Sequence, residues 1–126
     1  MGRKQLAKIE QIVDGRNRIR DAYVSLLQPL GFHPQRIGAN VRHNVQSMVF
    51  RVPDGCSRDG LILGLRERGV ESTIGTYALS STTYYAARYG GTSVHASELE
   101  HKTLTLPCFD GVDAPQVAET IKQVLA

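Results

Sequence analysis

The sequence lacks features that several classes of protein need. It has no tryptophan, and aromatic residues make up only 6% of its 126 positions, so we expect an aliphatic core. Its two cysteines, Cys56 and Cys108, are too few for a disulfide framework and lack C-x-x-C spacing. No apolar run approaches the ~18 residues that span a bilayer, and no apolar segment follows Arg3 and Lys4 as in a secretory signal. We therefore expect a cytoplasmic protein with free thiols and no membrane partner.

An excess of positive charge is present but small. The formal net charge is +3, and charged residues make up 21% of the chain, which is ordinary for a globular domain. A nucleic-acid-binding surface would need a one-sided basic stretch, and aromatic residues between the basic ones would strengthen it. The early basic residues have no such aromatics between them, so we favour a solvated helix face and expect no nucleic acid partner. These residues are Arg3, Lys4, Lys8, Arg16, Arg18 and Arg20.

The residues that hold metals or act as nucleophiles are scattered. No two histidines have the i, i+4 spacing of a helical metal site, and we expect no metal. Cys108 and His101 could form a thiol–base pair only if the fold joined them. A half-buried structural cysteine is the interpretation that we favour. The four histidines are His33, His43, His95 and His101.

Apolar residues recur at steps of three and four through the first 30 positions, which predicts a long helix. Gly15 weakens its middle by about 1 kcal/mol relative to alanine, and Gly31 is a natural end. In a small domain such a helix is exposed along part of its length, and in a larger protein it would bridge two domains. The stripe consists of Leu6, Ile9, Ile12, Val13, Ile19, Tyr23, Leu26, Leu27 and Leu30.

Three strands and three further helices are predicted after it. Ser57 caps the first of these helices, and Asp113 caps the last, with Pro115 in its first turn. Short strands separated by helices indicate a small sheet with helices packed against it. The strands are predicted at 46–52, 70–76 and 103–106, the helices at 58–68, 93–101 and from 113 onward, and irregular segments at 33–40 and 78–91.

Residues 69–85, GVESTIGTYALSSTTYY, are the most informative stretch. An amphipathic helix pattern precedes it, and the strand KTLTLP follows at 102–107. Together with GRKQLAKIEQIVDGRNRIRDAY at 2–23, this order resembles the C-terminal part of the DegT/DnrJ-type sugar-nucleotide aminotransferases. Those proteins are pyridoxal-phosphate (PLP) enzymes of fold type I, and the resemblance runs through the whole chain.

The resemblance implies an α/β (α+β) fold. We expect one domain over 1–126, the C-terminal small domain of a larger aminotransferase, with a linking helix at 1–31. Residues 41–126 would form a mostly antiparallel three-stranded sheet covered on one face by helices.

The family's Schiff-base lysine, pyridine-binding aspartate and most phosphate contacts lie in a large domain that precedes this part. We therefore expect no catalytic or cofactor-binding residue here. None of Lys4, Lys8, Lys102 and Lys122 resembles the family lysine in context.

The resemblance also implies an activity for the whole protein. PLP would carry an amino group, from glutamate, onto a keto-sugar linked to a nucleotide, as in polysaccharide biosynthesis. The partners implied are the large PLP-binding domain of the same protein, the nucleotide-sugar, glutamate and a second protomer of a homodimer. Alone, the fragment should be inactive. Dehydratase relatives that have lost the lysine stay open, because the deciding residue is not in this chain.

The candidate site residues lie in and after the informative stretch. Many family members carry His-Tyr-Pro near the mouth of the active site, where this chain has Thr76, Tyr77 and Ala78 after Gly75. The resemblance implies that this segment helps to wall the sugar site. Tyr77, Tyr84 and Tyr85 would stack on a sugar or donate hydrogen bonds, and Arg88 would reach a nucleotide phosphate. The alternative is that Tyr84 and Tyr85 pack against a helix and that Arg88 is an exposed loop residue.

A different class of function is also open. The chain could be a stand-alone, non-catalytic binding or dimerisation module. An uncovered apolar stripe on the long helix would favour self-association.

Overall fold

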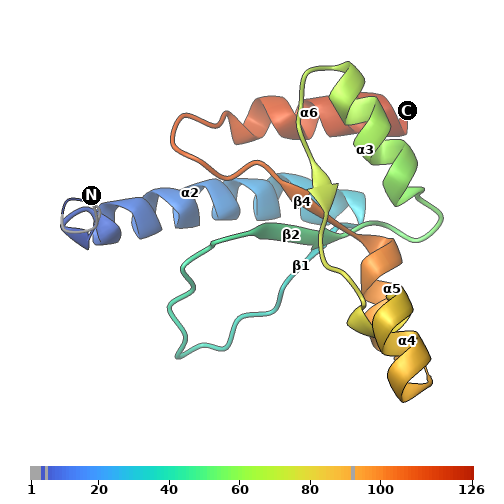
Figure 1. Ribbon diagram of the computed structural model, residues 1–126. Helices are drawn as coiled ribbons and strands as arrows, with labels where there is room; N and C mark the ends of the chain where they lie inside the picture. The colour runs from blue at the N-terminus through green and yellow to red at the C-terminus, as the bar shows by residue number, and fades with distance from the viewer. Residues whose placement is uncertain (1–3, 5, 92) are drawn as a thin grey trace.

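The computed structural model describes residue 4 and residues 6–91 and 93–126, so Arg3 lies outside the described residues. It is a mixed α/β structure in which helices lie against a small sheet (Figure 1). The helices are α2 (Ile9–Leu27), α3 (Arg58–Glu67), α4 (Thr83–Tyr89), α5 (Val94–Lys102) and α6 (Ala114–Leu125), with the 3₁₀ turns η1 (Gln28–Leu30) and η2 (Leu79–Ser81). The strands are β1 (His33–Pro34), β2 (Met48–Arg51), β3 (Thr73–Ile74) and β4 (Thr103–Leu106).

The sheet is antiparallel throughout, in the order β1-β2-β4-β3. The predicted fold class is confirmed, but the sheet has four strands because part of the predicted loop at 33–40 pairs as β1. Pro34 has no amide proton to donate, so it fits only at the edge of a sheet, where it lies. β2 and β3 are shorter than predicted, since only their central residues pair.

The core lies between one face of the sheet and helices α2, α3 and α6, with α6 packed between α2 and α3. We had expected an aliphatic core, but the core also contains aromatic rings. The ring of Phe50 on β2 meets Tyr23 and Phe32 edge-on, at centroid distances of 6.3 and 6.4 Å. Aliphatic residues surround these rings, among them Leu27, Leu61, Leu65, Leu104, Leu106 and Ile121.

The long helix is buried over only part of its length, as predicted. Tyr23 and Leu27 in its C-terminal half are fully buried, whereas Ile9 in its N-terminal half is 45% exposed. The helix runs through Gly15 without interruption. Gly31 ends η1 with a left-handed φ of 86°.

The predicted helix caps are confirmed. The Ser57 hydroxyl accepts from the amide of Gly60 at 3.1 Å, and the Asp113 carboxylate accepts from that of Gln116 at 3.0 Å. The spacing of Val117, Ile121, Val124 and Leu125 on the last helix predicts an apolar stripe, which is wrong at Leu125, because that residue is exposed. The buried residues of α6 are Ala114, Val117, Ala118 and Ile121.

The segment 78–91, predicted to be irregular, contains η2 and the helix α4. The apolar periodicity that predicts helices reflects burial, and no residue of α4 is buried. We call η2, α4 and α5 together the helical arm. None of its residues, all of which the structure describes, is buried, and α4 and α5 project away from the other helices (Figure 1).

Candidate functional site

The predicted site residues Gly75, Thr76 and Tyr77 follow β3 directly. The amide of Gly75 donates to the carbonyl of Thr103 at 3.0 Å. A side chain at this position would meet the Thr103 Cβ at 2.6 Å and the Val49 Cγ1 at 2.8 Å. Only glycine therefore fits this close approach without a shift. Beyond it the chain leaves the sheet, and Tyr77 is 66% exposed.

Tyr84, Tyr85 and Arg88 come together on α4. The rings of Tyr84 and Tyr85 meet edge-on at 5.3 Å, and Tyr85 stacks on Tyr89 at 5.8 Å with an interplanar angle of 24°. The Arg88 guanidinium lies 5.7 Å from the Tyr89 ring centre and its Nη1 donates to the Tyr84 hydroxyl at 3.4 Å. We call these four residues the tyrosine cluster. It presents aromatic faces, phenol hydroxyls and one cation on an exposed surface.

The rings of the tyrosine cluster lie outside the core. Tyr84 packs on Tyr85, Tyr85 stacks on Tyr89, and Tyr84 and Tyr85 remain 62% and 42% exposed. Tyr89 was missed by the sequence analysis. The i, i+4 spacing of Tyr85 and Tyr89 would have revealed it if a helix had been predicted there. No ring pairing or hydrogen bond among the described residues links Tyr77 to this cluster.

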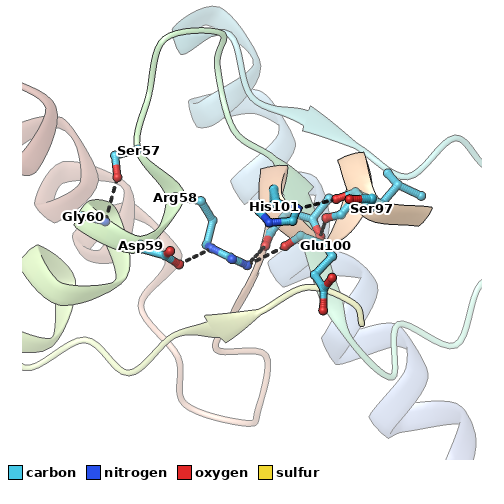
Figure 2. Close-up of polar contacts among 9 residues, drawn as sticks. Ser57, Arg58, Asp59, Gly60, Ser97, Glu100 and His101 are labelled. Carbon is cyan, nitrogen blue, oxygen red and sulfur yellow. Dashed lines mark hydrogen bonds and ion pairs between the residues drawn. The ribbon is translucent and has the colours of Figure 1, made fainter. Parts of the chain in front are cut away.

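The helical arm is joined to the sheet by polar contacts at the end of α5. Figure 2 shows Arg58, at the start of α3, reaching across to this end. Its Nη1 donates to the carbonyls of Glu100 at 2.8 Å and Thr103 at 3.1 Å, and its Nε donates to the Asp59 carboxylate at 2.6 Å. Arg51 on β2 pairs with Glu98 at 3.5 Å nearby.

The described lysines do not fit a PLP site. A Schiff-base lysine needs desolvation or a cationic neighbour to be nucleophilic at neutral pH. Lys4 and Lys8 are exposed. Lys102 and Lys122 are each 44% exposed and lie beside Asp54 and Glu119, respectively. None of the four described lysines therefore has the desolvated or cationic surroundings that a Schiff-base lysine needs.

The cysteines and histidines form no catalytic group in the described structure. Cys56 and Cys108 are free thiols, and burial raises the pKa of each. Cys108 and His101 lie beyond opposite ends of β4, and the His101 ring contacts the Ser97 carbonyl. Among the described residues, no three of the types His, Cys, Asp and Glu are grouped so as to hold a metal ion. Within that same part, no helix combines the length and the hydropathy needed to cross a bilayer.

A groove of about 440 Å³ lies elsewhere, between α2 and the segment that leads into α6. Its lining mixes cations with apolar residues, and it includes none of the six predicted site residues. Lining residues include Lys8, Ile12, Arg16, Arg18, Ile19 and Phe109. The cations on α2 do not form a one-sign stripe, because Glu10, Asp14 and Asp21 lie on the same helix.

Comparison with known proteins decides the family. The model of the DegT/DnrJ/EryC1/StrS aminotransferase family matches residues 1–125. This chain belongs to that family. The resemblance described from the sequence is thereby confirmed.

Solved structures of aminotransferases share the fold. TlmJ from Streptoalloteichus hindustanus is 23% identical with a TM-score of 0.88, and the match covers 98% of this chain and 34% of TlmJ. Spr1654 from Streptococcus pneumoniae in its PMP form is 23% identical, with a TM-score of 0.84 and coverage of 98% and 33%. Helicobacter pylori PseC, an aminotransferase involved in the biosynthesis of pseudoaminic acid, is 14% identical, with a TM-score of 0.85 and coverage of 98% and 35%. The chain thus spans about a third of the length of these aminotransferases.

Proposed function

We propose that this chain is the C-terminal small domain of a PLP-dependent aminotransferase that acts on nucleotide-linked keto-sugars. Its role is to form a wall of the substrate cleft and part of the subunit contact. The family match over residues 1–125 supports the reaction class. The tyrosine cluster is the observation that carries the role, because it places exposed aromatic rings and a guanidinium on a surface with no core function.

The chemistry of the stretch before Glu98, which includes η2 and α4, suits an anionic, hydroxyl-rich ligand. No carboxylate occurs between Glu71 and Glu98, a stretch that includes four tyrosines and many serines and threonines. A phosphate group would therefore meet Arg88 without repulsion from a neighbouring acid of this stretch. Tyrosine faces provide apolar contact for a sugar ring or a base, and their hydroxyls provide hydrogen bonds.

The remaining parts of the enzyme are proposed to lie outside this chain. PLP would be held by the large domain, where it would supply the electron sink for the transfer. Glutamate would be the amino donor, and the enzyme would act as a homodimer. A cytoplasmic location is supported by the free thiols of Cys56 and Cys108. Residues 1–126 would form one domain, with α2 linking it to the large domain. Thr76 and Ala78 depart from His-Tyr-Pro, so the sugar preferred here is expected to differ from that of His-Tyr-Pro members.

The isolated chain provides the first test. We expect it to be inactive and to form no internal aldimine with PLP, because its described lysines lie in solvent rather than in an apolar pocket. Absorbance and borohydride trapping followed by peptide mapping would check this. Free lysine in excess would compete for PLP with a lysine that reacts non-specifically. An adduct on Lys4, Lys8, Lys102 or Lys122 that persists in this excess would contradict the proposal.

The full-length enzyme tests the cleft wall. Replacing Tyr85 with serine should raise KM for the nucleotide-sugar by about fivefold, since loss of a stacking contact costs on the order of 1 kcal/mol. KM for glutamate should stay unchanged. Phe109→Ser is the matched control, because Phe109 is an exposed aromatic (61%) that lines the groove beside α2 rather than lying on the arm. Equal effects of the two variants would count against the arm as part of the cleft.

A dimerisation module is the second candidate function. Leu6, which precedes α2, is 71% exposed, and Ile9, the first residue of α2, is 45% exposed. A second copy of the chain would cover this apolar edge. This candidate needs no PLP and predicts self-association of the isolated chain.

A further inference from the structure

We infer that Arg58 is a positioning residue, which fixes the segment 75–77 and the helical arm relative to each other and to the sheet. These two segments carry every candidate site residue. The inference concerns contacts within this chain, and its meaning for substrate binding rests on the proposed function.

The helical arm cannot be positioned by a core of its own. None of its residues is buried, and a seven-residue helix such as α4 is unstable in water by itself. Its place is therefore set where it rejoins the sheet, at the end of α5 and the start of β4. The contacts at that junction decide the direction in which the arm projects.

The last carbonyls of α5 are bound by the rest of the domain. A helix leaves its final four carbonyls without partners inside the helix. The Thr103 hydroxyl donates to the Leu99 carbonyl at 2.6 Å, Arg58 donates to that of Glu100 at 2.8 Å, and the amide of Val52 donates to that of Lys102 at 2.8 Å. Arg58 is the charged donor among them, and a cation at a helix C-terminus is favourable.

The same guanidinium nitrogen also reaches the segment 75–77, through Thr103. The Thr103 carbonyl accepts from Arg58 Nη1 at 3.1 Å and from the Gly75 amide at 3.0 Å, so both of its lone pairs are used. Arg58, Thr103 and Gly75 therefore form a continuous set of hydrogen bonds. At one end of this set, Gly75 lies two residues before Tyr77. At the other end, Arg58 binds the carbonyl of Glu100 in α5, as the dashed lines around Arg58 in Figure 2 show.

Burial separates Arg58 from the other charged side chains at this junction. Its side chain is 6% exposed, whereas Lys102 and Glu98 are 44% and 45% exposed. Exposed ion pairs are weak because water and salt screen them. Removing this buried, charged donor leaves the Glu100 carbonyl without its partner, takes one of two donors from the Thr103 carbonyl, and costs more. We therefore expect Arg58 to have the dominant effect on the position of the arm.

Amide hydrogen exchange on the isolated chain, followed by NMR, tests this inference. In Arg58→Gln we expect the amides of Gly75 and of α5 to exchange about tenfold faster or more. The amides of α6 and of the β2–β4 pairing should keep their wild-type rates. Arg58→Lys should restore part of the protection, because an ammonium keeps the charge but lacks the planar fork.

Arg68→Gln is the matched control. Arg68 lies just after α3, is exposed, and its Nη1 donates to the Gly64 carbonyl of its own helix at 3.0 Å. It should leave Gly75 and α5 at wild-type rates. Equal acceleration of all amides in Arg58→Gln, or no change at Gly75 and α5, would overturn the inference. If Arg58→Gln does not fold, Arg58→Lys is judged by the same comparison, with a smaller selective acceleration expected.

The full-length enzyme then separates this inference from the proposed function. If both hold, Arg58→Lys raises KM for the nucleotide-sugar and leaves KM for glutamate unchanged. Selective loss of protection at Gly75 and α5 with unchanged KM would support the positioning role and overturn the cleft wall. A raised KM without any change in exchange at Gly75 and α5 would overturn the positioning role.

Discussion

Gly75 is the residue whose identity the packing constrains most tightly at the candidate site. Its φ is not in the left-handed region, so the constraint is steric. A Cβ would lie 2.6 Å from the Thr103 Cβ and 2.8 Å from the Val49 Cγ1, well inside contact distance. Gly75→Ala should therefore destabilise the fold by about 1–3 kcal/mol, as overpacking does. Urea unfolding would measure this.

The control for Gly75 is Gly38→Ala. A Cβ there would meet only the Val41 Cγ2, at an ordinary distance of 3.6 Å, so the free energy of unfolding should stay within about 0.5 kcal/mol of wild type. A Gly75→Ala protein as stable as Gly38→Ala would show that the strand end moves freely. The site would then be less tightly built than the close approach to Thr103 indicates.

The thiols of Cys56 and Cys108 should react slowly at neutral pH. Burial raises the pKa of both, and at Cys108 the charge of Arg16 only partly opposes it. Because the thiolate is the reactive form, the rate of alkylation should still be rising above pH 9.0, the ordinary thiol pKa. Iodoacetamide labelling of the folded chain, compared with the chain unfolded in urea, measures this. Faster labelling of folded Cys108 at neutral pH would revive a nucleophilic role.

The contact between β2 and α5 should depend on pH through Asp54. A hydrogen bond from Lys102, followed by the charge of Arg51, holds the pKa of its carboxyl below the ordinary 3.8. A lowered pKa in the folded state stabilises the fold above pH 3.8, and this contribution is lost as the pH falls through the folded-state pKa. Wild type should therefore be more stable than Asp54→Asn at about pH 6, and the difference should vanish near about pH 2.

Urea midpoints at the two pH values would measure this difference. Glu119→Gln is the control, because the Glu119–Lys122 pair lies within α6 alone. Added salt should reduce the Asp54 effect, since the pair is exposed. A difference in stability between wild type and Asp54→Asn that persists at the lowest pH would show that the charge of Asp54 is not its cause.

Among the elements, those with a buried face and a cap were predicted well. Ser57 and Asp113 accept the amide bonds expected of them, and the strand 103–106 is found at its predicted bounds. The exposed α4 was missed, since a helix without a buried face leaves no periodic apolar pattern. β1 was missed because its two residues show no alternation and include Pro34.

For the whole molecule, we expect the exposed apolar residues at and just before the start of α2 to decide whether the isolated chain self-associates. With Ile9 45% exposed and Leu6 71% exposed, we expect a concentration-dependent monomer–dimer equilibrium in sedimentation, as apolar surface favours association. Ile9→Gln should shift it toward the monomer. Leu63→Gln should not, although Leu63 is 60% exposed, because it lies on α3. A monomer at every concentration would remove the dimerisation candidate and leave the edge for the large domain.

The sequence by itself determined the helix caps, the long helix with its exposed half, the fold class and the family. These depend on residues a few positions apart, or on the order of several motifs along the chain. Tertiary structure decided that Gly75 touches Thr103, that Arg58 is buried and that the arm projects with its tyrosine cluster. Arg58 lies 42 and 45 positions from the two residues whose carbonyls it binds. Contacts of that separation exist only after the chain has folded, so no local pattern encodes them.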